Sequence, residues 1–377
     1  MAGSSERHHE PPGGTIRLPS RRAIAWGIQL FILISIGAIT IGFWWKSPAN
    51  LNELLANLDW RFALLIIPLV GIDYLVGGLR YRALFNGRVL TKVSLWDCMR
   101  SNWANIFMGA ATPMQTGGGA AQVYLLWRSG APVSEGVLAS LVNFAGTLVF
   151  FVCSSLAALL LIPTDLFGPK VTGLIQGAFV IVALVAVLVL GVVIFPRIGL
   201  WIIRQLYDRL LARIPRLGRA RDRVIGKAEH GVERFSGAVG HVGRRGRGSL
   251  ALVVLLTLIL FSNKFTIAYA VVRALGHEVP YSVFLGLKCV HLFVIYFAPT
   301  PGASGVAEVS SVWLMERVIP SELLLIYTVL WRLFTTVIGA VIGGFVLLLD
   351  VHRVGVGRVR DGLQDRGTAG GEYGYRE

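Results

Sequence analysis

Six ionisable side chains lie within otherwise apolar stretches of this chain, and they are the residues best placed to do chemistry. They are Asp73, Lys264, Lys288, His291, Glu308 and Arg332. An ionisable group at the centre of a bilayer costs roughly 2.5–3.5 kcal/mol on insertion scales, so each needs a partner or a polar cavity. Three cations against two carboxylates would favour an anionic ligand, such as a lipid phosphate.

The same side chains could instead pair with one another and only hold helices together. For Asp73 and Glu308 this interpretation is as strong as the functional one. Arg332 is the expected ion-pair partner of Glu308, whereas Lys264 has no evident partner in the sequence. Lys288 could also extend its ammonium group to the outer membrane interface.

Two breaks rich in glycine and proline interrupt the apolar sequence. They are TPMQTGGGAAQVYLLWRSG (Thr112–Gly130) and PTPGASGVAEVSSVWLMERV (Pro299–Val318), and in each a Thr-Pro pair precedes glycines and then Gln122 or Glu308. Lipid offers no water to freed backbone groups, so a break at membrane depth survives only inside protein or along a wet cavity. Two breaks in corresponding places predict a transporter-like binding site.

The glycines of the breaks permit unusual backbone angles and close approach. A half-helix that starts just after them would aim its free N–H groups and positive dipole end inward, which is an anion site. Close helix packing is the alternative use of small residues, and the Thr-Pro pairs favour half-helices. The candidate substrate-binding residues are therefore Glu308, Lys264, Arg332, Asp73, Lys288, His291, Gln122, Gly117, Gly118, Thr300, Pro301, Gly302 and Gly305.

The composition is that of an integral membrane protein. Of the 377 residues, 54% are apolar and only 15% are charged, against about 25% charged in a soluble domain. The net charge of +15 does not indicate nucleic acid binding, because residues 197–247 alone hold 13 Lys and Arg against 4 Asp and Glu. A cytoplasmic loop under the positive-inside rule explains that excess. Three cysteines in apolar segments form no disulfide framework.

Six stretches are long and apolar enough to be full spans. They are Ala23–Trp45, Trp60–Leu79, Val137–Ile162, Val171–Phe195, Leu250–Val272 and Leu323–Leu349. The basic residues before the first, after the second and between the fourth and fifth place those loops inside. Residues 94–127 and 281–319 then each start and end on one side. The predicted fold is an all-α polytopic integral membrane protein, with six full spans plus two re-entrant (broken) helical hairpins in an inverted repeat.

The domain boundaries follow from these spans. We expect a disordered cytoplasmic head at 1–22, a transmembrane domain at 23–349 and a disordered cytoplasmic tail at 350–377. Within the domain, repeat one covers 60–162 and repeat two covers 250–349, joined by a basic loop at 196–248. Both termini are predicted to be cytoplasmic, in the inner (cytoplasmic) cell membrane. The loop has helical apolar periodicity with arginines on the other faces, which suits either helices on an anionic leaflet or a linker that enforces topology.

Enzyme motifs are missing from the sequence. We find no HExxH, GxSxG, Walker lysine motif or cysteine pair with metal spacing, so no catalytic residue, metal or cofactor is expected. An intramembrane transferase using Glu308 and His291 as an acid/base pair is a third interpretation, which lacks a donor-binding motif.

The two broken hairpins resemble the transmembrane domain of the lysylphosphatidylglycerol synthase family, a flippase-like group. The resemblance rests on the two break motifs and on LWRLFTTVIGAVIGG (Leu330–Gly344). Members of that family join this domain to a soluble aminoacyltransferase domain, which has no counterpart here, so the resemblance implies no lysyltransferase activity. Val306 stands where a glycine is expected, and Gln122 stands where an acid is often found.

The sequence therefore predicts a lipid flippase that binds an anionic or aminoacylated phospholipid, or a polyprenyl-phosphate lipid, by its head group at the bilayer midplane. Lys264, Lys288 and Arg332 would cradle the phosphate. Asp73 and Glu308 would hold those cations or meet a cationic head group. The rival from another class is a membrane scaffold whose basic loop recruits a separate synthase or glycosyltransferase. Neither interpretation involves nucleic acid.

Overall fold

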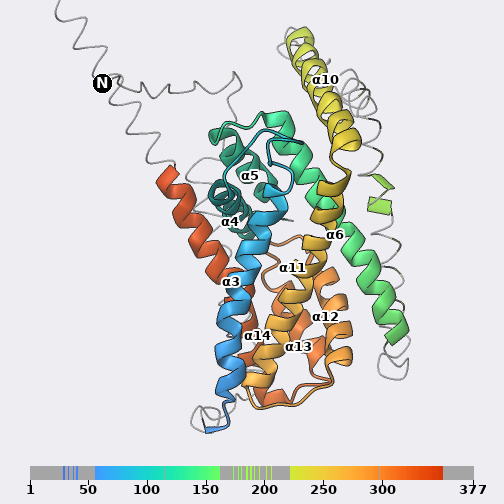
Figure 1. The fold of residues 1–377 in the computed structure, drawn as a ribbon. Helices are drawn as coiled ribbons and strands as arrows, with labels where there is room; N and C mark the ends of the chain where they lie inside the picture. The colour runs from blue at the N-terminus through green and yellow to red at the C-terminus, as the bar shows by residue number, and fades with distance from the viewer. Residues whose placement is uncertain are drawn as a thin grey trace, which may run out of the picture.

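The computed structural model describes residues 56–113, 115–161, 221–296 and 298–350, with isolated positions between 29 and 40 and between 173 and 205. The described residues form helices joined by short turns (Figure 1). The expected head, the tail beyond residue 350 and the first half of the basic loop lie outside the described residues. Apart from isolated positions, so do the expected spans Ala23–Trp45 and Val171–Phe195.

Four helices in the described part of the chain are long and apolar enough to cross a membrane. They are α3 (Trp60–Arg82), α6 (Val133–Leu161), α11 (Arg247–Ala274) and the helix Ser321–Asp350, which comprises α14 (Ser321–Arg332), a π-helical turn (Leu333–Val337) and a final α-helical stretch. The four correspond to four of the six predicted spans. Each runs past at least one predicted end, because residues that flank its apolar part continue the helix.

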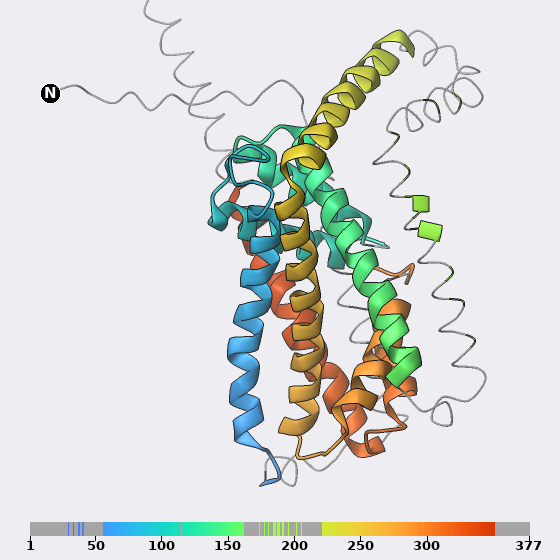
Figure 2. The same cartoon turned by 45° about the vertical axis from the view of Figure 1, so that its right-hand side comes forward.

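Two pairs of shorter helices form the broken hairpins. The first pair is α4 (Leu95–Ala111) and α5 (Thr116–Arg128), and the second is α12 (Tyr281–Tyr296) and α13 (Val306–Met315). Figures 1 and 2 show the first pair near the end of the bundle that carries α10, and the second pair near the opposite end. The long helices α3 and α11 precede the two pairs, as the predicted repeat requires.

The two breaks meet at their tips. Pro113 and Pro301 form an isolated antiparallel bridge. Next to them the chain turns through left-handed backbone, with φ of 56° at Gln115, 56° at Gly302 and 58° at Ala303. Such angles cost a residue with a Cβ roughly 1–3 kcal/mol, so the packing around both tips must hold them in place. The breaks therefore provide one contact between the two halves of the fold, at their tips.

Small residues let the long helices approach the hairpins closely. A Cβ on Gly343, in the last helix, would collide with the carbonyl oxygen of Trp103 on α4. On α3, a Cβ on Gly77 or Gly78 would collide with the side chain of Asn102 or Met99, again on α4. This is the close packing that small residues provide between membrane helices. It fixes α4 between α3 and the last helix.

The helix α10 (Arg221–Arg245) is the described part of the predicted basic loop. It projects from one end of the bundle in both views (Figures 1 and 2). Its C-terminal part packs on the bundle, since Val242 is buried and Phe235 and Val239 contact the same apolar cluster. The remaining surface of the helix carries exposed basic residues such as Arg234 and Arg244. The predicted helical periodicity of residues 224–242 is thus confirmed.

Candidate functional site

A cavity of about 590 Å³ lies where the two hairpins and the long helices meet. Both halves of the chain contribute to its wall: α3, α4, α5 and α6 from the first, and α11, α12 and the last helix from the second. The charged side chains that line it are Asp73, Arg80, Lys264, Lys288 and Arg332. The sequence therefore identified four of the five, although it did not show that Asp73 and Lys264 pair.

Arg332 and Glu308 form a buried ion pair. The Arg332 Nε donates to Glu308 Oε1 at 2.9 Å, and both side chains are less than a tenth exposed. The other carboxylate oxygen accepts the N–H of Gly305 at 2.7 Å, while Arg332 Nη2 donates to the carbonyl of Gly302 at 3.0 Å. The pair predicted from the sequence is confirmed. It holds the second break in shape, because one hydrogen bond joins Gly305 to α13, one joins Gly302 to α14, and the ion pair links the two helices.

Asp73 and Lys264 form the second ion pair of the cavity. The Lys264 Nζ donates to Asp73 Oδ2 at 2.8 Å, and the neighbouring Asn263 donates to the carbonyl of Leu69 at 2.8 Å. The expectation that Lys264 lacks a partner was wrong. Its partner lies on α3, in the other half of the chain, so only the packing of α3 against α11 brings the two together. The Lys264 side chain is 24% exposed, which keeps it accessible from the cavity.

Lys288 is held by neutral partners. Its Nζ lies 3.0 Å from His291 Nδ1 and 3.6 Å from the centre of the Trp331 ring. His291 Nε2 lies 2.9 Å from the carbonyl of Ala307, so its ring takes the Nε2–H tautomer and accepts from Lys288. Lys288 is 2% exposed, so the alternative in which it extends to the outer interface was wrong.

Arg80 is a cavity residue that the sequence analysis placed in a cytoplasmic loop. It lies in the last turn of α3, is buried, and donates to the carbonyl of Asn143 at 2.8 Å and toward Thr147 Oγ1 at 3.5 Å. The spacing between Arg80 and Asp73 was the sequence signal that could have shown that Arg80 faces the cavity. Residues seven apart on a helix share one face, so an inward-facing Asp73 also turns Arg80 inward.

Gln122, the counterpart of Glu308 in the first half, is a neutral hydrogen-bonding centre. Its Oε1 accepts from Tyr81 at 2.7 Å and from Asn105 at 2.6 Å, and its Nε2 donates to Ser140 at 2.8 Å. These partners come from α3, α4 and α6, and Gln122 is fully buried. The side chain lines the cavity, but its amide is already satisfied. Its hydrogen bonds join the two helices of the first hairpin to each other and to α3 and α6.

The glycines at the breaks serve close approach rather than an open anion site. A Cβ on Gly117 would lie 2.6 Å from Thr112 Cγ2, and one on Gly118 would lie 2.6 Å from Asn105 Oδ1. The N–H of Gly117 donates to Thr112 Oγ1 at 2.8 Å, and that of Gly305 is taken by Glu308. These two helix-start N–H groups thus bind the protein's own oxygen atoms. Thr300 and Pro301 form the tip of the second break.

The electrostatic outcome is an asymmetry among the cavity cations. Lys264 and Arg332 are neutralised by carboxylates, whereas within the described part of the chain Arg80 and Lys288 contact only neutral groups. A cavity with two cations that lack carboxylate partners attracts an anion. Among the described residues, no group of three His, Cys, Asp or Glu side chains could hold a metal ion.

The helices, the membrane-length spans and the charged internal cavity define an all-α membrane protein. Comparison with known proteins gives its family. Residues 28–343 match the family described as the lysylphosphatidylglycerol synthase TM region, so the chain belongs to that family. It is also similar to a protein named UPF0104 membrane protein from Archaeoglobus fulgidus. The two are 23% identical over 319 residues, which cover 81% of this chain and 91% of that protein.

Proposed function

We propose that this protein binds the phosphate head group of a membrane lipid in the central cavity and carries it between the leaflets. One observation supports this most strongly: the cavity combines Arg80 and Lys288, two buried basic side chains whose partners are neutral. A buried cation without a counter-ion is costly. A phosphate that enters the cavity would supply the negative charge that no carboxylate provides to these two side chains. The ligand class is an anionic phospholipid or a polyprenyl-phosphate lipid.

The dimensions of the cavity suit such a head group. At about 590 Å³ it falls within the range of roughly 300–1,000 Å³ typical of small-molecule sites. An arginine can bind two phosphate oxygens at once, and a lysine adds a compact charge. Arg80 comes from the first half of the chain and Lys288 from the second. A phosphate bound by both would therefore bridge the two repeats.

The arrangement of the hairpins supports movement across the bilayer. In this proposal the pair α4 and α5 enters the membrane from the cytoplasm and the pair α12 and α13 from the outside, with the cavity at the midplane and both termini cytoplasmic in the inner membrane. Opening one pair at a time would expose the bound head group to one side only, as in carriers built from inverted repeats. The chain would then act as a carrier rather than as an enzyme.

The experiment is a lipid-movement assay with purified protein in liposomes. The labelled panel contains phosphatidic acid, phosphatidylglycerol, lysylphosphatidylglycerol and a polyprenyl phosphate, with phosphatidylcholine as the neutral-head comparison. Lys288→Met and Arg80→Met should each slow movement of the favoured anionic lipid at least tenfold. Arg273→Gln, whose guanidinium pairs with Glu278 outside the cavity, should not. Equal rates in all four proteins would overturn the proposal.

The scaffold alternative is favoured by one observation, the projection of α10 with its exposed arginines. Deleting the basic loop is a poor test, because Val242 is part of the packed bundle. Reversing the charges of Arg234, Arg244 and Arg245 is cleaner, since all three are exposed. If the protein is a scaffold that recruits an enzyme through α10, cells with the charge-reversed variant should lack that enzyme's product. If it is a carrier, the purified variant should still move lipid in liposomes.

A further inference from the structure

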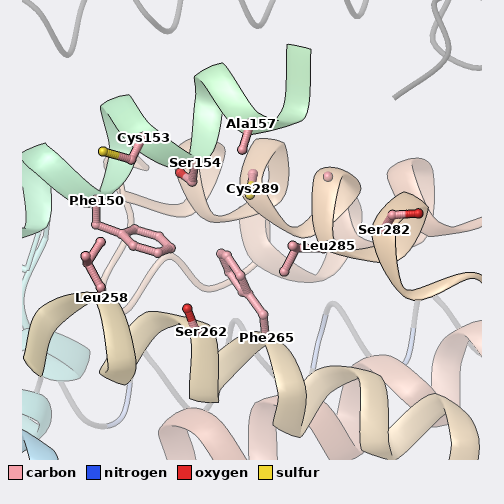
Figure 3. A pocket seen from close by; sticks show the side chains of 11 residues that line it. Phe150, Cys153, Ser154, Ala157, Leu258, Ser262, Phe265, Ser282, Leu285 and Cys289 are labelled. Carbon is pink, nitrogen blue, oxygen red and sulfur yellow. The ribbon is translucent and has the colours of Figure 1, made fainter. Parts of the chain in front are cut away.

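A second hollow lies between α6, α11 and α12. Its volume is about 220 Å³, and its wall is mainly apolar. Figure 3 shows Phe150 and Ala157 of α6 facing Leu258 and Phe265 of α11 across it, with Leu285 of α12 beside them. None of its residues is charged. The hollow, called the side groove below, therefore suits a hydrocarbon ligand.

The side groove opens onto the apolar outer surface of the helices. Cys153, which lines it, is exposed on α6, and Leu156 on the same helix is 53% exposed. On α11, Leu255 is 53% exposed and Ile259 is 41% exposed. Large exposed apolar side chains on a membrane-length helix are the surface that contacts lipid. The groove is thus continuous with the hydrocarbon region of the membrane.

Only one layer of aromatic rings separates the side groove from the charged cavity. Phe265 lines both spaces. Phe150, on the groove side, stacks on Phe261, on the cavity side, with ring centres 4.7 Å apart, and lies 5.6 Å from the ring of Phe265. Side-chain rotation of such rings needs no break in a helix. A polar compartment and an apolar compartment therefore adjoin across a partition of aromatic side chains.

We propose that the side groove holds a hydrocarbon chain of the same lipid whose phosphate occupies the charged cavity. This inference rests on the proposed function and adds the route that the chain takes. A lipid with its head inside the protein must leave its chain in contact with apolar surface, and this groove adjoins the head-group cavity. An apolar cavity of about 150 Å³ accepts benzene, so 220 Å³ has room for several chain carbons.

The groove directs the chain more than it adds affinity. A chain that moves from bilayer to groove exchanges one apolar environment for another, so hydrophobic transfer contributes little. What the groove supplies is a path from Phe265 to the surrounding lipid. Filling that path should therefore act on lipids with long chains and leave head-group analogues without chains unaffected.

The first test fills the groove from α6. Ala157→Trp places an indole in the groove, and Leu156→Trp, one residue away on the exposed face, is the matched control. Binding is measured with long-chain phosphatidic acid and with glycerol phosphate. Ala157→Trp should weaken binding of phosphatidic acid about tenfold, because the indole blocks the path that the chain must take while the head group occupies the cavity. Glycerol phosphate has no chain, so its binding should be unchanged. Equal affinity of both variants for phosphatidic acid would overturn the groove assignment.

The second test uses the unmodified protein, so it does not depend on a variant that folds. Phosphatidic acid with a photoreactive diazirine in its chain is cross-linked, and the labelled residues are mapped by mass spectrometry. Labelling should concentrate on Cys153, Ala157 and Ser262 and fall when unlabelled phosphatidic acid competes. Labels spread evenly over exposed positions such as Ile67 and Val341 would overturn the groove assignment. If the unmodified protein did not bind glycerol phosphate, the head-group site of the proposed function would be overturned instead.

Discussion

The backbone of Pro113 pairs with that of Pro301, although the two residues belong to different halves of the chain. Proline has no N–H, so the hydrogen bonds of this antiparallel bridge must come from flanking residues. The prolines themselves then form the closely spaced kind of pair, with Cα atoms about 4.5 Å apart. The bridge joins the tips of the two hairpins beside the charged cavity. It is the contact that must break if either hairpin moves alone.

If the proposed lipid movement requires the two tips to separate, a disulfide across this bridge should block it. We predict that Pro113→Cys with Pro301→Cys, in a Cys153→Ser background, cross-links under mild oxidation, because disulfides span Cα separations of roughly 4.4–6.8 Å. Lipid movement should stop on oxidation and return with a reductant. The measurement is the liposome assay combined with mass analysis of the cross-linked peptide.

The single-cysteine proteins are the controls for this experiment, and they should respond to neither oxidant nor reductant. Cys98 and Cys289 are buried, so they should contribute little background. An oxidised double variant that still moves lipid would show that the tips need not separate during transport.

Breaking the ion pair of Glu308 and Arg332 should destabilise the protein strongly. Glu308→Gln removes the carboxylate that pairs with the buried Arg332 guanidinium, and breaking a buried pair in this way costs about 3–5 kcal/mol. The expected result is a large drop in the thermal unfolding temperature in detergent. Glu278→Gln is the matched control, since Glu278 pairs with Arg273 at 3.0 Å but its side chain is 82% exposed, and such pairs contribute at most about 1 kcal/mol.

A second variant separates charge from packing at the same site. Glu308→Gln with Arg332→Gln removes both charges and should recover part of the lost stability. If Glu308→Gln and Glu278→Gln shifted the unfolding temperature equally, the pair would not hold the second break in place.

Local sequence was enough to predict one ion pair within the second half of the chain. Glu308 and Arg332 lie on neighbouring helices, so a break followed by a short turn brings them together. The partner of Lys264 could not be found this way, because Asp73 lies in the other half. Their pairing depends on how α3 and α11 rotate against each other, which apolar periodicity does not encode.

Two further side chains show where a sequence pattern misleads. Arg80 follows the apolar part of its helix, so the positive-inside rule assigned it to a loop, although its helical register with Asp73 turns it inward. Gln122 was predicted to bind substrate from its place in the expected repeat; it lines the cavity, and its amide also bonds to Tyr81, Asn105 and Ser140, which the pattern did not show. Hydrogen bonds from three separate helices cannot be read from a repeat alone.

Removing the Asp73 carboxylate should strengthen anion binding. Asp73→Asn frees the Lys264 ammonium group, now 2.8 Å from the carboxylate, and gives the cavity a third cation without a carboxylate partner. We expect phosphatidic acid to bind roughly fivefold to tenfold more tightly at low salt, about 1 kcal/mol. Titration by isothermal calorimetry would measure it, and high salt should reduce the gain if the cavity is wetted.

Asp97→Asn is the comparison for that prediction, because Asp97 pairs with Arg100 at 3.1 Å and neither residue lines the cavity. It removes the same charge from the protein without changing the site. Tighter binding in both variants would indicate a general effect of net charge, and weaker binding in Asp73→Asn would contradict the proposed anion site.

The contact of Gly343 with α4 should tolerate no added methyl group. Gly343→Ala places a Cβ against the Trp103 carbonyl oxygen. Because a backbone carbonyl cannot move aside as easily as a side chain, we expect the free energy of unfolding to fall by about 1–3 kcal/mol. Gly71→Ala on α3 is the matched control, because a Cβ there meets nothing within 4 Å and alanine favours a helix by roughly 0.5–1 kcal/mol. The thermal unfolding temperature in detergent should therefore fall in Gly343→Ala and rise in Gly71→Ala. A shift of the same sign in both variants would mean that this contact does not hold α4 against the last helix.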